Sequence, residues 1–113
     1  INMGGETTVL NMTPEVVEPY LVRVKTGEKV FVNKPVFRIG KEKSYVDYFI
    51  ADNTAISRSH CNIHTENGEY YIEDTNSTNH TFINGKIINS NVKTKIVSGD
   101  RIRLATEEFT FTV

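Results

Sequence analysis

Three polar stretches of this sequence carry side chains that can bind an anion. FRIGKEK contains Lys41, DNTAISRSH contains Ser57 and Arg58, and DTNSTNHTFING contains Thr78 and Asn79. Together these residues supply cations, hydroxyl groups and an amide, with no carboxylate among them. A phosphate monoester requires such a set, because cations neutralise its charge and neutral donors bond its oxygens. The three stretches therefore indicate a phosphate-binding site if the fold brings them together.

The third stretch is also longer than a simple turn. It holds eight consecutive polar residues, 74–81, before it closes with an Asn-Gly pair. Side chains of this kind hydrogen-bond to nearby backbone, and they favour turns for that reason. A turn between strands needs only about two to five residues, so a longer polar loop in a compact domain is often functional. An ordinary solvated loop is the simpler interpretation when this stretch is taken alone.

Short alternating runs typical of β-strands recur from Tyr20 onward. They read YLVRVK, EKVFVN, PVFRIG, CNIHTE and EYYIED, and turn signals separate them. No segment shows a sustained helical period of about 3.6 residues. Many short strands at this spacing predict an all-β sandwich or barrel. In such folds the end loops carry the function, which directs attention to the loops 40–46, 52–59 and 75–81.

One β-hairpin can be predicted together with its register. An Asn-Gly dipeptide, a strong signal for a two-residue turn, separates CNIHTE from EYYIED. Pairing around this turn sets Ile63 opposite Ile72 and Thr65 opposite Tyr70. These side chains and Cys61 then share one face, which we expect to be the core face.

The composition describes one globular domain without a broad charge field. The 113 residues leave room for one modest core, and 38% of them are hydrophobic and 24% charged. With 13 Lys and Arg against 14 Asp and Glu, no basic surface for nucleic acid is expected. No apolar run approaches the length that spans a membrane. The single cysteine, Cys61, cannot form an internal disulfide, which favours a reducing, cytoplasmic compartment.

The polar stretches resemble those of a known family. FRIGK, ISRSH and DTNSTNHTFING occur in the order and spacing of the forkhead-associated (FHA) domain, a phosphothreonine reader, and the resemblance covers residues 20–113. It implies an FHA-like β-sandwich of two antiparallel or mixed sheets with the binding loops at one end. It also implies a phosphothreonine-dependent binding module that is not an enzyme and uses no cofactor.

The resemblance assigns roles to individual residues. Lys41 occupies the position of a phosphate-contacting Arg, and Ser57 matches a Ser whose hydroxyl bonds a phosphate oxygen. Arg58 lies beside the pocket, while Thr78 and Asn79 match loop residues that contact the phosphate and hold the ligand backbone. The residues expected to shape the loops are Gly40, His60, His80, Asn84 and Gly85.

Two positions depart from the family pattern. Lys41 replaces a bidentate Arg fork with a point charge, which still suits phosphate but is less directional. His80 stands where a Gly usually follows the loop Asn, at a steric cost if that position requires a positive φ. These departures keep one alternative open, a degenerate FHA fold that binds proteins independently of phosphate.

Metal binding and catalysis have weaker support. His60 and His64 lie four residues apart on an expected strand, which separates them by roughly 13 Å at ~3.3 Å per residue. No cluster of Cys or His supplies further ligands. No nucleophile-elbow pattern surrounds Ser57 or Ser59. Cys61, on the expected core face, is interpreted as an inert buried thiol.

Residues 1–19 are predicted to form a flexible tail or linker ahead of the domain at 20–113. Within this segment Glu6-Thr7-Thr8 resembles the tail motif of small bacterial FHA regulators, in which a phosphorylated threonine docks onto its own domain. Thr7 and Thr8 are therefore candidate phosphorylation sites. A linker to an upstream domain is an equally good interpretation, and the chain opens at Ile1 in the manner of a fragment of a longer protein.

The sequence as a whole predicts a cytoplasmic, bacterial-type FHA module of Ser/Thr-kinase signalling. Its expected partner is a phosphothreonine-containing protein or peptide, a class that includes substrates of such kinases and the module's own tail. Nucleic acids, membranes and metals are not expected partners.

Overall fold

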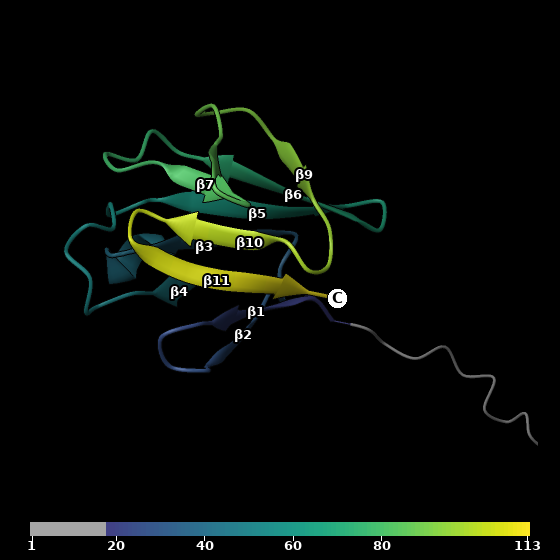
Figure 1. Cartoon of the computed structure of the whole chain (residues 1–113), viewed down its shortest axis with the longest axis horizontal. Helices are drawn as coiled ribbons and strands as arrows, with labels where there is room; N and C mark the ends of the chain where they lie inside the picture. Colours follow the sequence, from purple (N-terminus) through teal and green to yellow (C-terminus); the bar gives the residue numbers. More distant parts are fainter. Residues whose placement is uncertain (1–17) are drawn as a thin grey trace, which may run out of the picture.

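The computed structural model describes residues 18–113 (Figure 1). The predicted tail falls almost entirely outside these residues, and Thr7 and Thr8 lie outside them. The described elements are β1 (Tyr20–Arg23), β2 (Lys29–Phe31), β3 (Val36–Gly40), the 3₁₀ helix η2 (Lys43–Tyr45), β4 (Tyr48–Phe49), β5 (Cys61–Glu66), β6 (Glu69–Asp74), β7 (Thr81–Ile83), β8 (Lys86–Ile87), β9 (Thr94–Ile96), β10 (Arg101–Leu104) and β11 (Glu107–Thr112).

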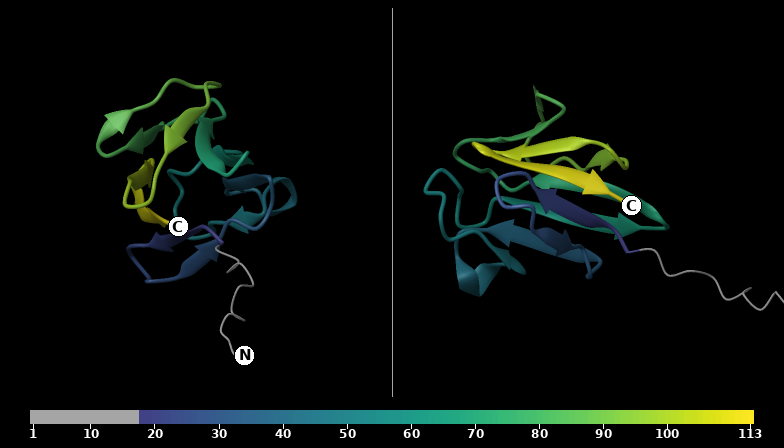
Figure 2. Two further views of the ribbon diagram at one scale, coloured as in Figure 1. Left: turned by 90° about the vertical axis from the view of Figure 1, so that its right-hand side faces the viewer. Right: turned by 60° about the horizontal axis from the view of Figure 1, so that its bottom comes forward.

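The strands form two sheets that face each other. The six-stranded sheet has the order β2-β1-β11-β10-β7-β8, and the five-stranded sheet has the order β4-β3-β5-β6-β9. Only β3 and β4 pair in parallel among the described strands. Figure 2 shows the two layers from the end of the sandwich and from an oblique angle. The all-β sandwich of one antiparallel and one mixed sheet confirms the predicted fold class.

The hairpin of β5 and β6 has the register expected from its turn. Ile63 lies opposite Ile72 and Thr65 lies opposite Tyr70. Ile63, Ile72 and Cys61 are completely buried, and Tyr70 packs against the core with its ring centroid 5.4 Å from that of a phenylalanine of β11. Burial raises the pKa of the Cys61 thiol, which stays protonated and inaccessible.

The core fills the space between the sheets. Each large side chain removed from water contributes roughly 1.5–3 kcal/mol to the free energy of unfolding. The largest fully buried side chains are those of Leu21, Ile39, Ile50, Ile56, Ile63, Ile72, Ile96, Ile102, Leu104, Phe109 and Phe111. Ile50 and Ile56 belong to the long segment between β4 and β5, so the core also anchors that loop.

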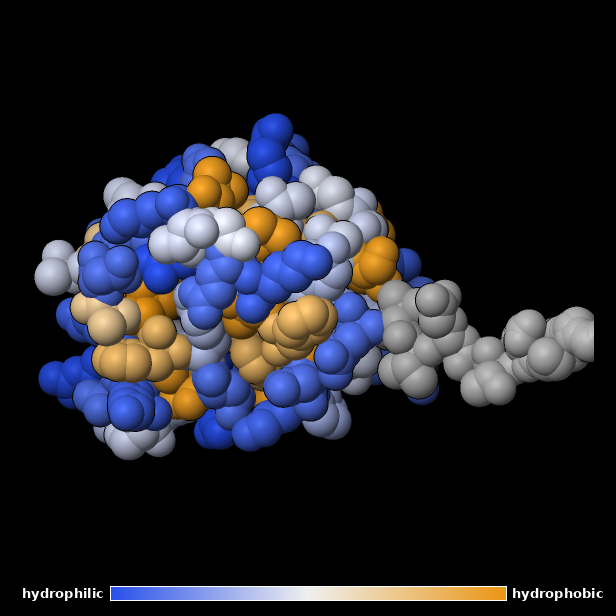
Figure 3. All heavy atoms as spheres, turned by 90° about the horizontal axis from the view of Figure 1, so that it is seen from below, coloured by the Kyte–Doolittle hydropathy of each residue, from blue (hydrophilic) through white to orange (hydrophobic). Residues whose placement is uncertain are grey.

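The outer surface mixes hydrophilic and apolar side chains. Figure 3 shows the face seen from below, where apolar side chains are interspersed among hydrophilic ones. Exposed aromatic residues include Phe31 on β2 and Phe49 on β4. No helix in residues 18–113 has the length and hydropathy needed to span a bilayer. The same residues contain no group of three or more His, Cys, Asp or Glu side chains arranged to hold a metal ion.

Sheet topology brings the predicted functional loops to one end. β5 runs antiparallel to β3 and to β6, with Cys61 opposite both Ile39 and Asp74. The end of β3, the start of β5 and the end of β6 therefore lie at the same edge of the sheet. The loops that leave these strand ends gather there, at the left of Figure 1.

Asp47 stabilises the connection from β3 to β4. Its carboxylate accepts hydrogen bonds from Lys34 Nζ at 2.8 Å, from the Arg38 backbone N–H at 2.9 Å and from Arg38 Nε at 3.3 Å. The Asp47 N–H in turn donates to the Arg38 carbonyl at 2.8 Å. Burial raises the pKa of Asp47, but the hydrogen bonds from Lys34 and Arg38 outweigh this effect and lower the pKa to about 2.

We expect Asp47 to make folding stability depend on acid pH. Since its pKa is lower in the folded chain than in the unfolded chain, its contribution is complete above about pH 4 and is lost as the pH falls toward about 2. Asp47→Asn should cost roughly 1–2 kcal/mol at neutral pH and flatten the decline below about pH 4. Urea unfolding across this pH range measures both effects, with the exposed Glu108→Gln as control. A variant with the pH dependence of the wild type would contradict the assignment.

Candidate functional site

The loops at the end of the sandwich surround an open pocket of about 470 Å³. Its lining residues are Lys41, Thr54, Ala55, Ile56, Ser57, Arg58, Ser59, Asn76, Thr78 and Asn79. Every residue predicted to bind phosphopeptide is among them, and no carboxylate is. The structure thus brings the predicted binding residues together, while their contact with a ligand stays a prediction.

Ser57 connects the loop after β4 to the loop after β6. Its Oγ accepts a hydrogen bond from the Thr78 backbone N–H at 3.0 Å. Asn79 makes a second connection, because its Nδ2 donates to the Ala55 carbonyl at 3.0 Å. Since the Ser57 oxygen serves as an acceptor within the protein, its own O–H is left to donate elsewhere. One N–H and the carbonyl oxygen of the Asn79 amide are likewise left for a ligand.

His60 connects the loop 52–59 to the loop 75–81 and does not line the pocket. Its ring is completely buried, its Nδ1 accepts the Ser57 N–H at 3.0 Å, and its Nε2 donates to the His80 carbonyl at 3.0 Å. Burial lowers the pKa of His60 despite the hydrogen bond to His80, so the ring is neutral. Neutral imidazole has one donor and one acceptor, and both are used here. The ring of His60, one of the residues expected to shape the loops, therefore connects the backbones of Ser57 and His80.

Gly40 lets two loop backbones meet. The N–H of Lys41 donates to the carbonyls of Ser57 at 2.9 Å and Arg58 at 3.1 Å, and the Glu42 N–H donates to the Arg58 carbonyl at 3.1 Å. A Cβ on Gly40 would collide with the Arg58 carbonyl oxygen. The glycine is therefore required by close packing of backbone and not by a left-handed conformation.

Asp74 organises the loop after β6, a role that the sequence interpretation missed. Its buried carboxylate accepts hydrogen bonds from the backbone N–H of Ser77 at 3.1 Å, from Thr81 Oγ1 at 2.7 Å and from Ser90 Oγ at 2.6 Å, as well as from Ser77 Oγ. Burial raises the pKa of Asp74, but the hydroxyls of Ser77, Ser90 and Thr81 lower it below its ordinary value. The Ser77 hydroxyl is consequently directed inward and does not line the pocket.

The remaining loop-shaping residues have positive φ angles, and the Asn84 side chain also donates to Asp100 Oδ1 at 3.0 Å and accepts the Arg101 N–H at 2.9 Å. His80 has a φ of 70°, so the position where the family has Gly does require the left-handed region. Its side chain is exposed and lies edge-on to Phe82, with the ring centroids 6.5 Å apart. Asn84 and Gly85, with φ of 51° and 84°, form the tight turn between β7 and β8, away from the pocket lining.

The fold is shared with solved FHA structures. The EmbR protein of Mycobacterium tuberculosis, solved with a low-affinity phosphopeptide, has a TM-score of 0.82 and 27% identity over 93% of this chain. This chain spans only 28% of the EmbR chain. The N-terminal FHA domain of Saccharomyces cerevisiae Rad53, solved with a phosphothreonine peptide, has a TM-score of 0.77 and 17% identity over 86% of this chain and 94% of that one. At that identity the second likeness shows the fold alone.

The sequence also matches a family model. No curated protein matches the sequence. The model of the FHA domain matches residues 37–105, which extend from β3 into the β10–β11 turn and contain all the residues of the pocket. This match covers more than half of the chain, and the sandwich and its loops agree with it. The chain belongs to the FHA domain family.

Proposed function

We propose that this FHA domain is a non-catalytic module that binds phosphothreonine-containing peptides in Ser/Thr-kinase signalling. The observation that carries the proposal is the pocket in which Lys41 and Arg58 meet the free donors of Ser57 and Asn79. A phosphate monoester carries a charge of about −1.5 to −2 near neutral pH and three acceptor oxygens. The pocket offers cations for that charge and neutral donors for those oxygens.

The electrostatics of the pocket favour a dianion. Within residues 18–113 neither Lys41 nor Arg58 forms an ion pair, so both charges are available to a ligand. The nearby carboxylate of Asp74 is directed away from the pocket, since it is buried among hydroxyls. A ligand without an anionic group would leave the cations of the pocket without a partner. The alternative function, phosphate-independent protein binding, accounts for these cations only if the bound protein presents acidic side chains to them.

The proposed setting is the bacterial cytoplasm. The bacterial part of this proposal is supported by the likeness to mycobacterial EmbR at 27% identity. The cytoplasmic part is supported by the single cysteine, which cannot form an internal disulfide. The expected partners are substrates of Ser/Thr kinases.

A phosphorylated tail is a further proposed ligand of the same pocket. Pro19 enters the domain at the far end, where its carbonyl accepts the Val32 N–H at 2.9 Å close to the β5–β6 hairpin. Thr8 precedes Pro19 by 11 residues, a reach of about 36–40 Å when fully extended. A strand of 6 residues such as β5 spans about 20 Å, to which the loops add their own height. The available length therefore supports docking of phosphorylated Thr7 or Thr8 on the same molecule.

Phosphate dependence is the primary test. A phosphothreonine peptide drawn from a degenerate library should bind, and its unphosphorylated twin should not. Ser57→Ala or Lys41→Ala should weaken binding about tenfold to a hundredfold, because each charge-assisted hydrogen bond contributes roughly 1.5–3 kcal/mol. Isothermal titration measures the affinities, with Lys43→Ala as a control that removes a neighbouring charge outside the pocket. Equal affinity for both peptides would favour the phosphate-independent alternative.

Lys41→Arg should preserve or strengthen phosphopeptide binding. A planar guanidinium can hold two phosphate oxygens at once and loses less freedom per bond formed. The same titration compares the variant with the wild type. Weakening by more than about threefold would mean that the pocket is shaped around an ammonium group.

Phosphorylation of Thr7 or Thr8 should occlude the pocket. A tethered ligand reaches effective concentrations near the millimolar range, so even a site with a Kd of ~10 μM would be mostly filled by the tail. The experiment compares phosphorylated chain, unphosphorylated chain and Thr7→Ala/Thr8→Ala for outside-peptide affinity and for mass in solution. Reduced affinity independent of protein concentration indicates docking on the same molecule, and concentration-dependent dimers indicate docking between molecules. Unchanged affinity with a monomeric mass would assign the tail to a linker.

A further inference from the structure

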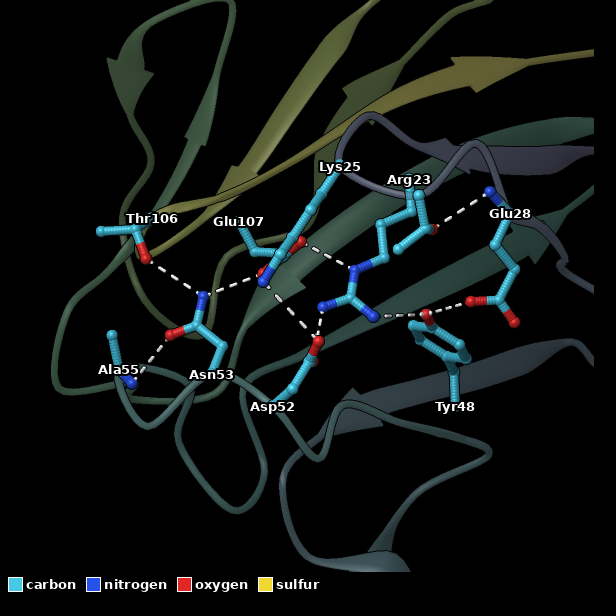
Figure 4. Close-up of polar contacts among 10 residues, drawn as sticks. Arg23, Lys25, Glu28, Tyr48, Asp52, Asn53, Ala55, Thr106 and Glu107 are labelled. Atoms are coloured by element: carbon cyan, nitrogen blue, oxygen red, sulfur yellow. Dashed lines mark hydrogen bonds and ion pairs between the residues drawn. The ribbon is translucent and has the colours of Figure 1, made fainter.

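A polar network joins β1, the start of β11 and the loop 52–59 (Figure 4). At its centre Arg23 Nε donates to Glu107 Oε2 at 2.7 Å, and both side chains are almost completely buried. Arg23 Nη2 also donates to Asp52 Oδ1 at 2.7 Å. These residues belong to β1, β11 and the loop, so the ion pairs join the six-stranded sheet to the loop.

Asn53 extends this network toward the pocket. Its Nδ2 donates to Glu107 Oε1 at 2.9 Å and to Thr106 Oγ1 at 3.0 Å. Its Oδ1 accepts the backbone N–H of Ala55 at 2.9 Å. Both donors and the oxygen of this amide are thus engaged, which defines the orientation of the side chain. Figure 4 shows the amide between Glu107 and Ala55.

The backbone held by Asn53 leads directly into the pocket. The Asn53 carbonyl accepts the N–H of Ile56 at 3.3 Å, so two successive amides of the loop are bound to this residue. The carbonyl of Ala55 accepts the Asn79 Nδ2 at 3.0 Å. An unbroken series of hydrogen bonds therefore runs from Glu107 through Asn53 and Ala55 to Asn79, a residue of the pocket.

We infer that Asn53 and Glu107 are positioning residues: through them the six-stranded sheet holds the pocket-lining loop 52–59 in the conformation that binds phosphopeptide. This inference rests on the proposed function, because it concerns the affinity of the same pocket. Binding groups lose effect when their supporting contacts let them move by fractions of an ångström. The network stands where such a support is needed, because Ser57 and Ala55 belong to an irregular segment without strand pairing of its own.

The inference can be tested by exchanging donor and acceptor in the Asn53–Glu107 hydrogen bond. Asn53→Asp places two carboxylates face to face, and Glu107→Gln turns an amide N–H₂ toward either Asn53 or Arg23, both of which are donors. In the double variant the new amide at position 107 can donate to the new carboxylate at position 53 and still accept from Arg23. The double variant also keeps the net charge of the wild type. It therefore restores the hydrogen bond with its polarity reversed.

Each single variant is expected to bind phosphothreonine peptide about tenfold more weakly than the wild type, and the double variant is expected to regain most of that loss. Affinity is measured at a temperature where urea unfolding shows every variant to be folded. Glu66→Gln, which removes a carboxylate from an exposed ion pair with Lys93, serves as control for lost charge. Single variants that lose stability but keep wild-type affinity would overturn the inference, and so would a double variant without recovery.

Two further measurements cover the other outcomes. If a single variant does not fold, Thr106→Val takes its place. This substitution removes the hydrogen bond between Thr106 and Asn53 and leaves the Arg23–Glu107 pair intact. Wild-type affinity of Thr106→Val for phosphothreonine peptide would then overturn the inference. If the wild type binds no phosphothreonine peptide, the proposed function fails. Positioning is then judged from the backbone amide resonances of Ala55 and Thr78 in the free protein. These should shift in Asn53→Asp and return in the double variant, and unshifted resonances would contradict positioning.

Discussion

The binding end of this sandwich depends on one buried carboxylate, that of Asp74. A charge removed from water is costly unless hydrogen bonds replace those of the solvent, and the Asp74 carboxylate is only 1% exposed. The replacement donors are Ser77 and Thr81 of the loop 75–81 and Ser90 of the connection between β8 and β9. Satisfying one charge thus closes the loop 75–81 over the strand end.

This requirement explains the polar stretch that first suggests a functional loop. Most of its hydroxyl and amide residues belong to one of two groups that point in opposite directions, while Thr75 bonds the Ser59 carbonyl. Ser77 and Thr81 point inward and serve Asp74, whereas Thr78 and Asn79 lie at the pocket. The inward residues fold the loop around Asp74, and the outward residues attach it to the loop 52–59 through the hydrogen bonds to Ser57 and Ala55.

Local features of the fold could be predicted from the sequence. The Asn-Gly turn and the alternation around it were enough for the register of β5 and β6, since both are properties of adjacent residues. The resemblance located Lys41 and Ser57, which the fold brings to one pocket. The Arg23–Glu107 pair was missed, although EEFTFT places Glu107 on the same strand face as buried phenylalanines. A buried acid requires a partner, but this partner lies 84 residues away and no local pattern identifies it.

Pro19 and Val113, at the two ends of the domain, lie close together, and this closeness affects how the domain can be joined to other domains. β1 and β11 pair so that Tyr20 lies opposite Thr112, and the two ends of the sandwich domain therefore emerge beside each other at the edge remote from the loops (Figure 1). Polypeptide attached at either end is therefore joined to the domain at a point away from the residues that line the pocket. A unit with neighbouring ends can be inserted into, or removed from, a longer chain with little disturbance of its surroundings. Such an arrangement suits a recognition element that evolution can combine with many different enzymes and regulators.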